Sequence, residues 1–119
     1  MARQNQKRVY VFDMGNGTVK IGVSKNIEQR RQAVMGNSGL QIIQYCYSHK
    51  LPIKKVFEIE SACHQHFANK HVFREFFAVS YFEAKTYLAT HVNIVGESHD
   101  FPQSFSVNKR GETIWHDRF

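Results

Sequence analysis

The chain has 119 residues, which is enough for one domain with a buried core and too few for two. Its 42% hydrophobic and 13% aromatic residues indicate a folded globule, and no apolar run approaches the roughly 18 residues that span a bilayer. The formal net charge is +6, so a polyanionic partner is favoured over an acidic or membrane-embedded role. No secretory leader is recognisable, so we expect a cytoplasmic protein with no membrane partner.

The positive charge is concentrated in the first third of the chain. Residues 1–37 carry seven Lys/Arg and two Asp/Glu, a net of +5, whereas residues 38–96 carry six and four, a net of +2. Residues 97–119 carry three and four, a net of −1. Lysine and arginine contacts to phosphates release counterions, so the basic part suits DNA, although ordinary solubility also accounts for a charge of this size.

The N-terminal part predicts an arm followed by a hairpin. Residues 1–7 are polar, basic and without periodicity, and we expect a flexible arm there. Residues 7–13 and 18–24 alternate as strands do, and the Gly15-Asn16-Gly17 turn between them favours an antiparallel hairpin. A helix is predicted over residues 26–35, with Asn26 as its N-cap and a glycine-rich stop at residues 36–39.

The remaining pattern predicts one more strand and two more helices. Residues 40–51 are rich in Ile and Tyr and predict a third strand, and a longer helix is expected from about residue 53 to Phe67. Residues 73–79 are expected to be extended, and residues 81–95 helical. For the tail the sequence leaves three alternatives. The tail could form a short hairpin around residues 108–111, pack on the domain, or mediate self-association. The two cysteines, without a CxxC pair, are expected to be free thiols.

The expected fold is therefore α+β, with a small three-stranded antiparallel sheet flanked by helices. The expected organisation is a basic arm over residues 1–7, one domain over residues 8–95 and a C-terminal extension of unknown role over residues 96–119.

The turn from the second strand into the first helix is a candidate phosphate site. A glycine near the strand end, the hydroxyl of Ser24 and the guanidinium of Arg30 one helical turn later leave an accessible gap beside a cation. Most α/β proteins have such a turn, so an ordinary structural role is the alternative. The candidate nucleic-acid contacts are Lys20, Ser24, Lys25, Arg30 and Arg31.

The later helix carries a carboxylate and an imidazole four residues apart. Glu60 and His64 interrupt a mostly apolar face and point the same way on a helix. In one interpretation Glu60 reaches water and His64 binds a backbone group. In the other, Glu60 has a functional role, which depends on a resemblance to a known family.

At these positions the chain resembles the GIY-YIG nuclease superfamily, in its phage-type branch with Lys-Ile-Gly in the second motif. Val9-Tyr10 stands where the first motif ends in tyrosine, Lys20-Ile21-Gly22 stands at the second motif, and Arg30 has the spacing of the motif arginine. Glu60 to Phe67 and Glu75-Phe76-Phe77 stand at the two later motifs. The first-motif glycine is replaced by Arg8, and the second-motif tyrosine by Lys20.

The resemblance implies a metal-dependent endonuclease that hydrolyses DNA phosphodiester bonds, phage-encoded and acting in a bacterial host. Tyr10 would position or deprotonate the water, Lys20 would favour the phenolate or contact the phosphate, and Arg30 would hold a phosphate oxygen. Glu60 would bind Mg²⁺ or Mn²⁺, and His64 would shuttle a proton or make a structural bond. An enzyme with one active site would cut both DNA strands most simply as a homodimer, or would nick one strand at a time as a monomer.

Two alternatives remain at this point. A non-cleaving protein on the same fold could bind nucleic acid or inhibit a host enzyme through its basic face. The chain could also be an unrelated small α/β enzyme.

Overall fold

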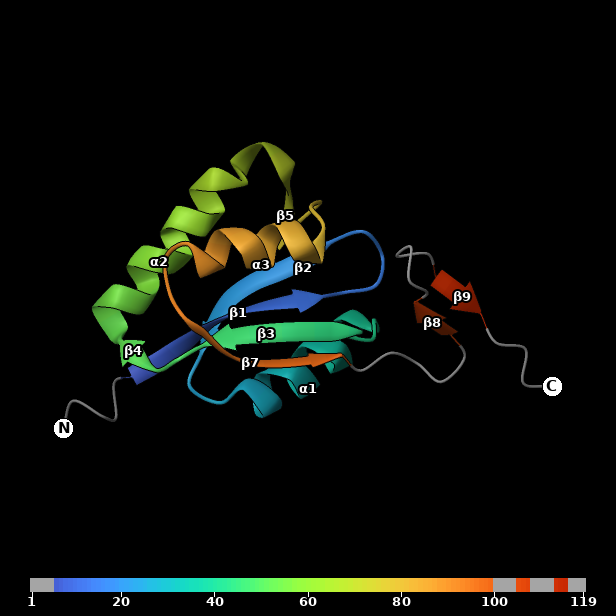
Figure 1. Cartoon of the computed structure of the whole chain (residues 1–119), viewed down its shortest axis with the longest axis horizontal. Helices are drawn as coiled ribbons and strands as arrows, with labels where there is room; N and C mark the ends of the chain where they lie inside the picture. The colour runs from blue at the N-terminus through green and yellow to red at the C-terminus, as the bar shows by residue number, and fades with distance from the viewer. Residues whose placement is uncertain (1–5, 100–104, 108–112, 116–119) are drawn as a thin grey trace.

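A computed structural model of the protein describes residues 6–99, 105–107 and 113–115. Within these residues the chain forms three α-helices, a large antiparallel sheet and a separate two-stranded sheet (Figure 1). In this part of the chain, none of the helices combines the length and apolar character that crossing a bilayer requires.

The predicted hairpin is present. Strand β1, Gln6–Asp13, pairs antiparallel with β2, Val19–Ser24, and the register places Tyr10 opposite Gly22. The turn closes with a hydrogen bond from the Met14 amide to the Thr18 carbonyl, 3.1 Å long. Gly15 and Gly17 have φ values of 74° and 87°, a region that residues with a Cβ rarely adopt.

The large sheet has seven strands, so the prediction of three was wrong. Its order is β5-β6-β2-β1-β3-β7, and β4 pairs separately with β1. Strands β4, β5 and β6 have two or three residues each, which is too short for an alternating pattern to show in the sequence. The bounds of these strands are β3, Gln44–Ser48; β4, Leu51–Pro52; β5, His71–Phe73; β6, Phe76–Phe77; and β7, Ile94–His99.

The first helix begins and ends as its caps dictate. Helix α1, Ile27–Ser38, starts after Asn26, whose side-chain oxygen accepts a hydrogen bond from the Gln29 amide at 3.0 Å. It ends at Gly39, which has a φ of 73° and donates to the Met35 carbonyl at 2.9 Å. The helix therefore ends three residues later than predicted, because its stop is Gly39 and not Gly36.

The two other helices lie together on the opposite face of the sheet (Figure 1). Helix α2, Ile53–His66, agrees with the prediction and is followed by the short 3₁₀ helix η2, Ala68–Lys70. Helix α3, Tyr81–Ala89, is capped by Ser80, which accepts from the Glu83 amide at 3.0 Å. The prediction of a helix over residues 81–95 was too long, because the chain leaves the helix after Ala89 and pairs with β3 as β7.

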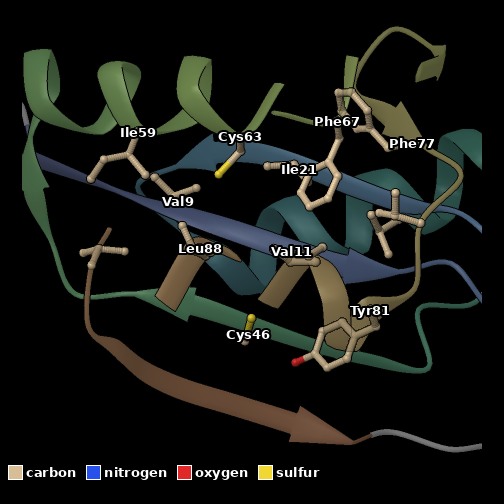
Figure 2. Packing of buried hydrophobic residues seen from close by; sticks show 14 of the residues in the cluster. Val9, Val11, Ile21, Cys46, Ile59, Cys63, Phe67, Phe77, Tyr81 and Leu88 are labelled. Carbon is tan, nitrogen blue, oxygen red and sulfur yellow. The ribbon is translucent and has the colours of Figure 1, made fainter. Parts of the chain in front are cut away.

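The alternation of β1 divides the core into two layers. Val9 and Val11 pack with Ile21, Cys63 and Leu88 beneath α2 and α3 (Figure 2). The intervening residues of β1 face α1, where Tyr10 and Phe12 are fully buried with Ile27, Val34 and Ile42. Cys46 and Cys63 are buried free thiols, as predicted.

The ends of the chain differ from the expected organisation. Strand β1 begins at Gln6, so residues 6 and 7 of the expected arm belong to the sheet, while residues 1–5 lie outside the described residues. Strand β7 crosses the expected boundary at residue 96. Beyond it, β8, Phe105–Val107, pairs with β9, Thr113–Trp115, as a hairpin whose turn lies outside the described residues.

Candidate active site

The side chains of Tyr10 and Glu75 meet above Gly22, at the centre of the candidate site. Tyr10 is the partner of Gly22 across the hairpin and passes its ring over the glycine. A Cβ at this position would collide with the phenol oxygen, lie 2.7 Å from the Tyr10 Cζ atom and 2.9 Å from the Glu75 Oε2 atom. The glycine is required because the phenol and the carboxylate both occupy the space above it.

Glu75 joins the site through the turn between β5 and β6. Its Oε2 atom lies 2.7 Å from the ammonium of Lys20, and its carbonyl accepts a hydrogen bond from the Ile21 amide at 3.1 Å. Glu75 is not among the predicted site residues. The Glu75-Phe76-Phe77 motif marked the segment in the sequence but not the ion pair that brings Glu75 to Lys20.

The burial of Tyr10 keeps its phenol neutral at ordinary pH. Burial is the main cause that raises the pKa of Tyr10 above its usual value, and the charges of Glu75 and Glu60 add to it, whereas Arg30 acts in the opposite direction. Of the two roles expected for Lys20, one is to favour the phenolate and the other is to contact the phosphate. The ammonium of Lys20 is paired with Glu75, so the cation that opposes the rise is Arg30.

Glu60 is a half-buried carboxylate that makes no hydrogen bond or ion pair with the residues that the structure describes. Burial raises the pKa of its carboxyl, and the charge of Glu75 contributes, while His64, Lys20 and Lys7 lower it. The charges of Glu60 and Glu75 thus act on each other and on Tyr10. This carboxylate is available to bind a cation.

His64 connects α2 to β2 beside the glycine. Its Nε2 atom lies 2.9 Å from the carbonyl oxygen of Ile21, and its ring packs against Phe77 at 5.1 Å between ring centroids. A carbonyl oxygen only accepts hydrogen bonds, so Nε2 carries the hydrogen and donates it. Of the two roles considered for His64, the geometry favours the structural bond that fixes α2 against the strand carrying Gly22.

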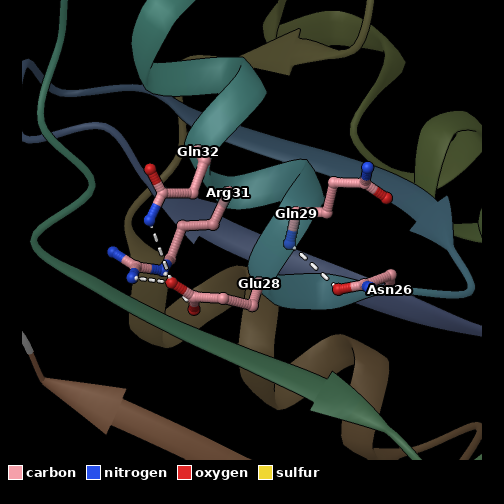
Figure 3. Close-up of polar contacts among 5 residues, drawn as sticks. All are labelled: Asn26, Glu28, Gln29, Arg31 and Gln32. Atoms are coloured by element: carbon pink, nitrogen blue, oxygen red, sulfur yellow. Dashed lines mark hydrogen bonds and ion pairs between the residues drawn. The ribbon is translucent and has the colours of Figure 1, made fainter.

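Arg30 extends from α1 toward the same region. It is exposed and forms no ion pair within the described part of the chain. Its neighbour Arg31 instead donates to Glu28, with Nη2 2.6 Å from Oε1, and lies 5.3 Å from the Tyr45 ring centroid (Figure 3). The two adjacent arginines are therefore in different electrostatic environments.

Ser24 is occupied by the chain itself. Its hydroxyl donates to the Asn26 carbonyl at 3.0 Å and accepts from the Asn26 amide at 3.1 Å. It shapes the turn before α1 and is buried. Of the five predicted nucleic-acid contacts, Arg31 does not line either of two grooves at Arg30, and the other four do: Lys20, Ser24, Lys25 and Arg30. Lys20 and Ser24 are also engaged within the protein, by Glu75 and Asn26 respectively.

Two grooves meet at Arg30. One, of about 580 Å³, is lined by Lys7 and Lys25 as well as Arg30. The other, of about 490 Å³, is lined by Lys20 and Arg74 as well as Arg30. Neither lining contains an Asp or a Glu. The result is a basic surface that continues on both sides of Arg30, as a phosphate backbone would require.

The donor atoms near the site suit a hard cation with few protein ligands. Among the described residues no three His, Cys, Asp or Glu side chains are grouped to hold a metal ion. Magnesium usually keeps several waters and uses one or two carboxylates together with phosphate oxygens. The unpaired carboxylate of Glu60 fits this pattern.

Comparison with known proteins identifies the family. The model of the T5orf172 domain matches residues 7–92, and no curated protein or solved structure matches. This corrects the assignment to the GIY-YIG superfamily that the motifs suggested. The four motifs are short, and they show only that a hairpin and two helices carry certain residue types at certain spacings. Such a pattern does not distinguish one family from another. Because the match covers well over half of its length, the chain belongs to the T5orf172 domain family.

Proposed function

We propose that this protein is a metal-dependent endonuclease that hydrolyses DNA phosphodiester bonds. One observation supports the proposal above all: the charges of Arg30 and Glu60 both act on the phenol of Tyr10, and Arg30 also lines two basic grooves. A phosphodiesterase needs a group beside the attacking water, a cation for the phosphate and charge neutralisation in the transition state.

Each residue has a role that follows from its surroundings. Arg30 binds a phosphate oxygen through its fork of N–H donors. The ionised phenol of Tyr10 would take a proton from a water molecule whose oxygen forms a bond to phosphorus, while the P–O bond to the leaving oxygen breaks and that oxygen takes a proton from solvent. The phenol is buried in the free protein, so this role requires that substrate binding brings a water to it. Glu60 holds Mg²⁺ or Mn²⁺, which when bound offsets the negative charge that develops on the phosphate and leaving oxygens. Lys20 neutralises Glu75, so that this carboxylate repels the phosphate less.

The test is cleavage of supercoiled plasmid in EDTA, Mg²⁺ or Mn²⁺ by the parent protein and two matched variants. We expect metal-dependent nicking or linearisation by the parent, a loss of at least about tenfold for Arg30→Gln, and little change for Arg31→Gln, because Arg31 is paired with Glu28. Equal activity of the two variants would contradict the role of Arg30.

A non-cleaving DNA-binding protein is the second candidate function. The observation that favours it is the raised pKa of Tyr10, which leaves the phenol neutral near pH 7. The two candidates differ in pH dependence. If the phenolate of Tyr10 is the base, the cleavage rate rises about tenfold per pH unit between about pH 7 and 9, because the ionised fraction does. Salt-sensitive DNA binding with no cleavage at any of these pH values would establish the binding protein.

A further inference from the structure

One large aromatic side chain lies exposed on the wall of one of the two basic grooves at Arg30. Phe73, at the end of β5, is 59% exposed and lines the groove of about 490 Å³ together with Lys20, Arg30 and Arg74. The guanidinium of Arg74 lies 5.1 Å from its ring centroid. Single exposed hydrophobic residues are ordinary on protein surfaces, so the feature of interest is that this ring shares a groove with three cationic side chains.

The turn that carries this ring is held in place at several points. The Glu75 carboxylate is paired with Lys20, the Glu75 carbonyl accepts from the Ile21 amide, and His71 Nε2 donates to the Arg74 carbonyl. Arg74 itself has a φ of 49°, and it is the one described residue other than glycine with a positive φ. Strained backbone that is fixed by its surroundings occurs often at binding sites.

The chemistry of the groove matches a nucleotide. The cations of Arg30 and Arg74 form no ion pair within the described residues and suit phosphates, while Phe73 and Phe76 give an apolar, aromatic wall. A base stacks on an aromatic ring irrespective of its identity, and arginine adds a cation–π contribution. Inside a duplex both faces of each base are already stacked, so away from the duplex ends only an unpaired base can offer a face to Phe73.

We propose that Phe73 is a stacking platform for an unpaired base, and that the preferred substrate is therefore DNA with unpaired nucleotides beside the scissile phosphate. The inference rests on the proposed function, since it names the substrate class of the same site. Phe73 and Arg30 line one groove, so a strand whose phosphate is bound by Arg30 runs past the exposed ring.

A second exposed phenylalanine, on α3, provides the control. Phe82 is 76% exposed, more than Phe73, and lines a cavity with Asp13, Lys85 and Glu97. Lys85 is paired with Glu97, so this cavity lacks the excess of positive charge that the groove beside Phe73 has. Phe82→Ala thus removes an exposed ring of the same kind from a place where no DNA contact is expected.

The experiment measures binding in EDTA, where cleavage is absent, of an oligothymidylate, a blunt duplex and an oligonucleotide carrying 2-aminopurine. We expect Phe73→Ala to weaken single-strand binding by about tenfold, and Phe73→Trp to retain it, because one stacked base is lost or kept. Duplex binding changes less than about twofold, and Phe82→Ala changes neither. Quenching of 2-aminopurine is expected with the parent and is lost in Phe73→Ala.

An equal loss of single-strand and duplex affinity in Phe73→Ala, or unchanged single-strand affinity and quenching, would overturn the inference. Circular dichroism establishes that the variant is folded, as expected for an exposed position. The outcome is independent of cleavage. Stacking without metal-dependent cleavage would refute the nuclease function and support the stacking role of Phe73. Cleavage without stacking would support the nuclease function and refute the stacking role.

Discussion

At the scale of single residues, Gly22 determines whether the site can form. Adding one methyl group places a Cβ against the Tyr10 phenol and 2.9 Å from the Glu75 carboxylate, so one of them has to move. We expect Gly22→Ala to reduce cleavage at least about tenfold and to lower the free energy of unfolding by about 1–3 kcal/mol, as overpacking does.

The matched control is Gly36→Ala within α1. Nothing lies within 4 Å of a Cβ at Gly36, and the position has an ordinary helical φ. Alanine there is expected to stabilise the protein by about 0.5–1 kcal/mol and to leave cleavage unchanged. Urea unfolding and the plasmid assay measure both effects. The account of Gly22 fails if the two variants behave alike.

The sequence was sufficient to place some of the site residues and not others. Strand and helix patterns predicted the elements that carry Tyr10, Arg30 and Glu60, and the structure has these residues on β1, α1 and α2. Their roles in a site came from the resemblance and stay a prediction. The role of Glu75 could not be predicted, because it depends on a two-residue turn that carries its side chain to Lys20. The pKa of Tyr10 depends on burial beneath α1, which no local pattern reveals.

At the scale of elements, the contact between α2 and β2 aligns Glu60 with the rest of the site. We expect His64→Ala to lower cleavage, since the hydrogen bond to the Ile21 carbonyl is lost, and His64→Gln to restore most of it, since the amide nitrogen can donate to the same oxygen.

A glutamine cannot transfer protons near neutral pH, so the pair of variants separates a positioning role from a proton shuttle. With positioning, His64→Gln keeps both the rate and the pH profile of the parent. Equal loss in both variants, with a changed pH profile in His64→Gln, would show that His64 moves protons. Melting temperatures establish that both variants are folded.

Local sequence signals predicted some of the helices and strands correctly and misplaced others. Strong local signals were sufficient for the β1–β2 hairpin, the start of α1 at Asn26 and the extent of α2. The end of α3 was misplaced because Thr90–Asn93 carries no glycine or proline, and β7 is defined by pairing with a distant strand. Short edge strands likewise exist only through their partners.

At the scale of the whole molecule, two buried thiols couple stability to pH. Burial raises the pKa of Cys46 to about 11 and that of Cys63 to about 12. Thiols of the unfolded chain ionise near about pH 8.5. Because the folded state favours the neutral thiols, their contribution to stability is complete below about pH 8.5 and is lost as the pH rises through the two raised values.

We therefore expect the urea midpoint to fall between about pH 8 and 10.5, and to fall less steeply in Cys63→Ala, whatever that variant's stability at neutral pH. The slope with pH is compared, so a cavity left by the substitution does not affect the conclusion. A midpoint that is constant over this range in the parent would contradict the burial of the thiols.

The central claim concerns the molecule as a DNA-cleaving enzyme, and Glu60 tests it most directly. The measurement is metal-dependent cleavage of supercoiled plasmid by the parent, Glu60→Gln and Glu58→Gln, the last being an exposed carboxylate two residues away on α2. The account predicts cleavage by the parent and Glu58→Gln and its loss in a folded Glu60→Gln. Cleavage by Glu60→Gln at the parent rate, or intact plasmid with every protein and metal, would contradict it.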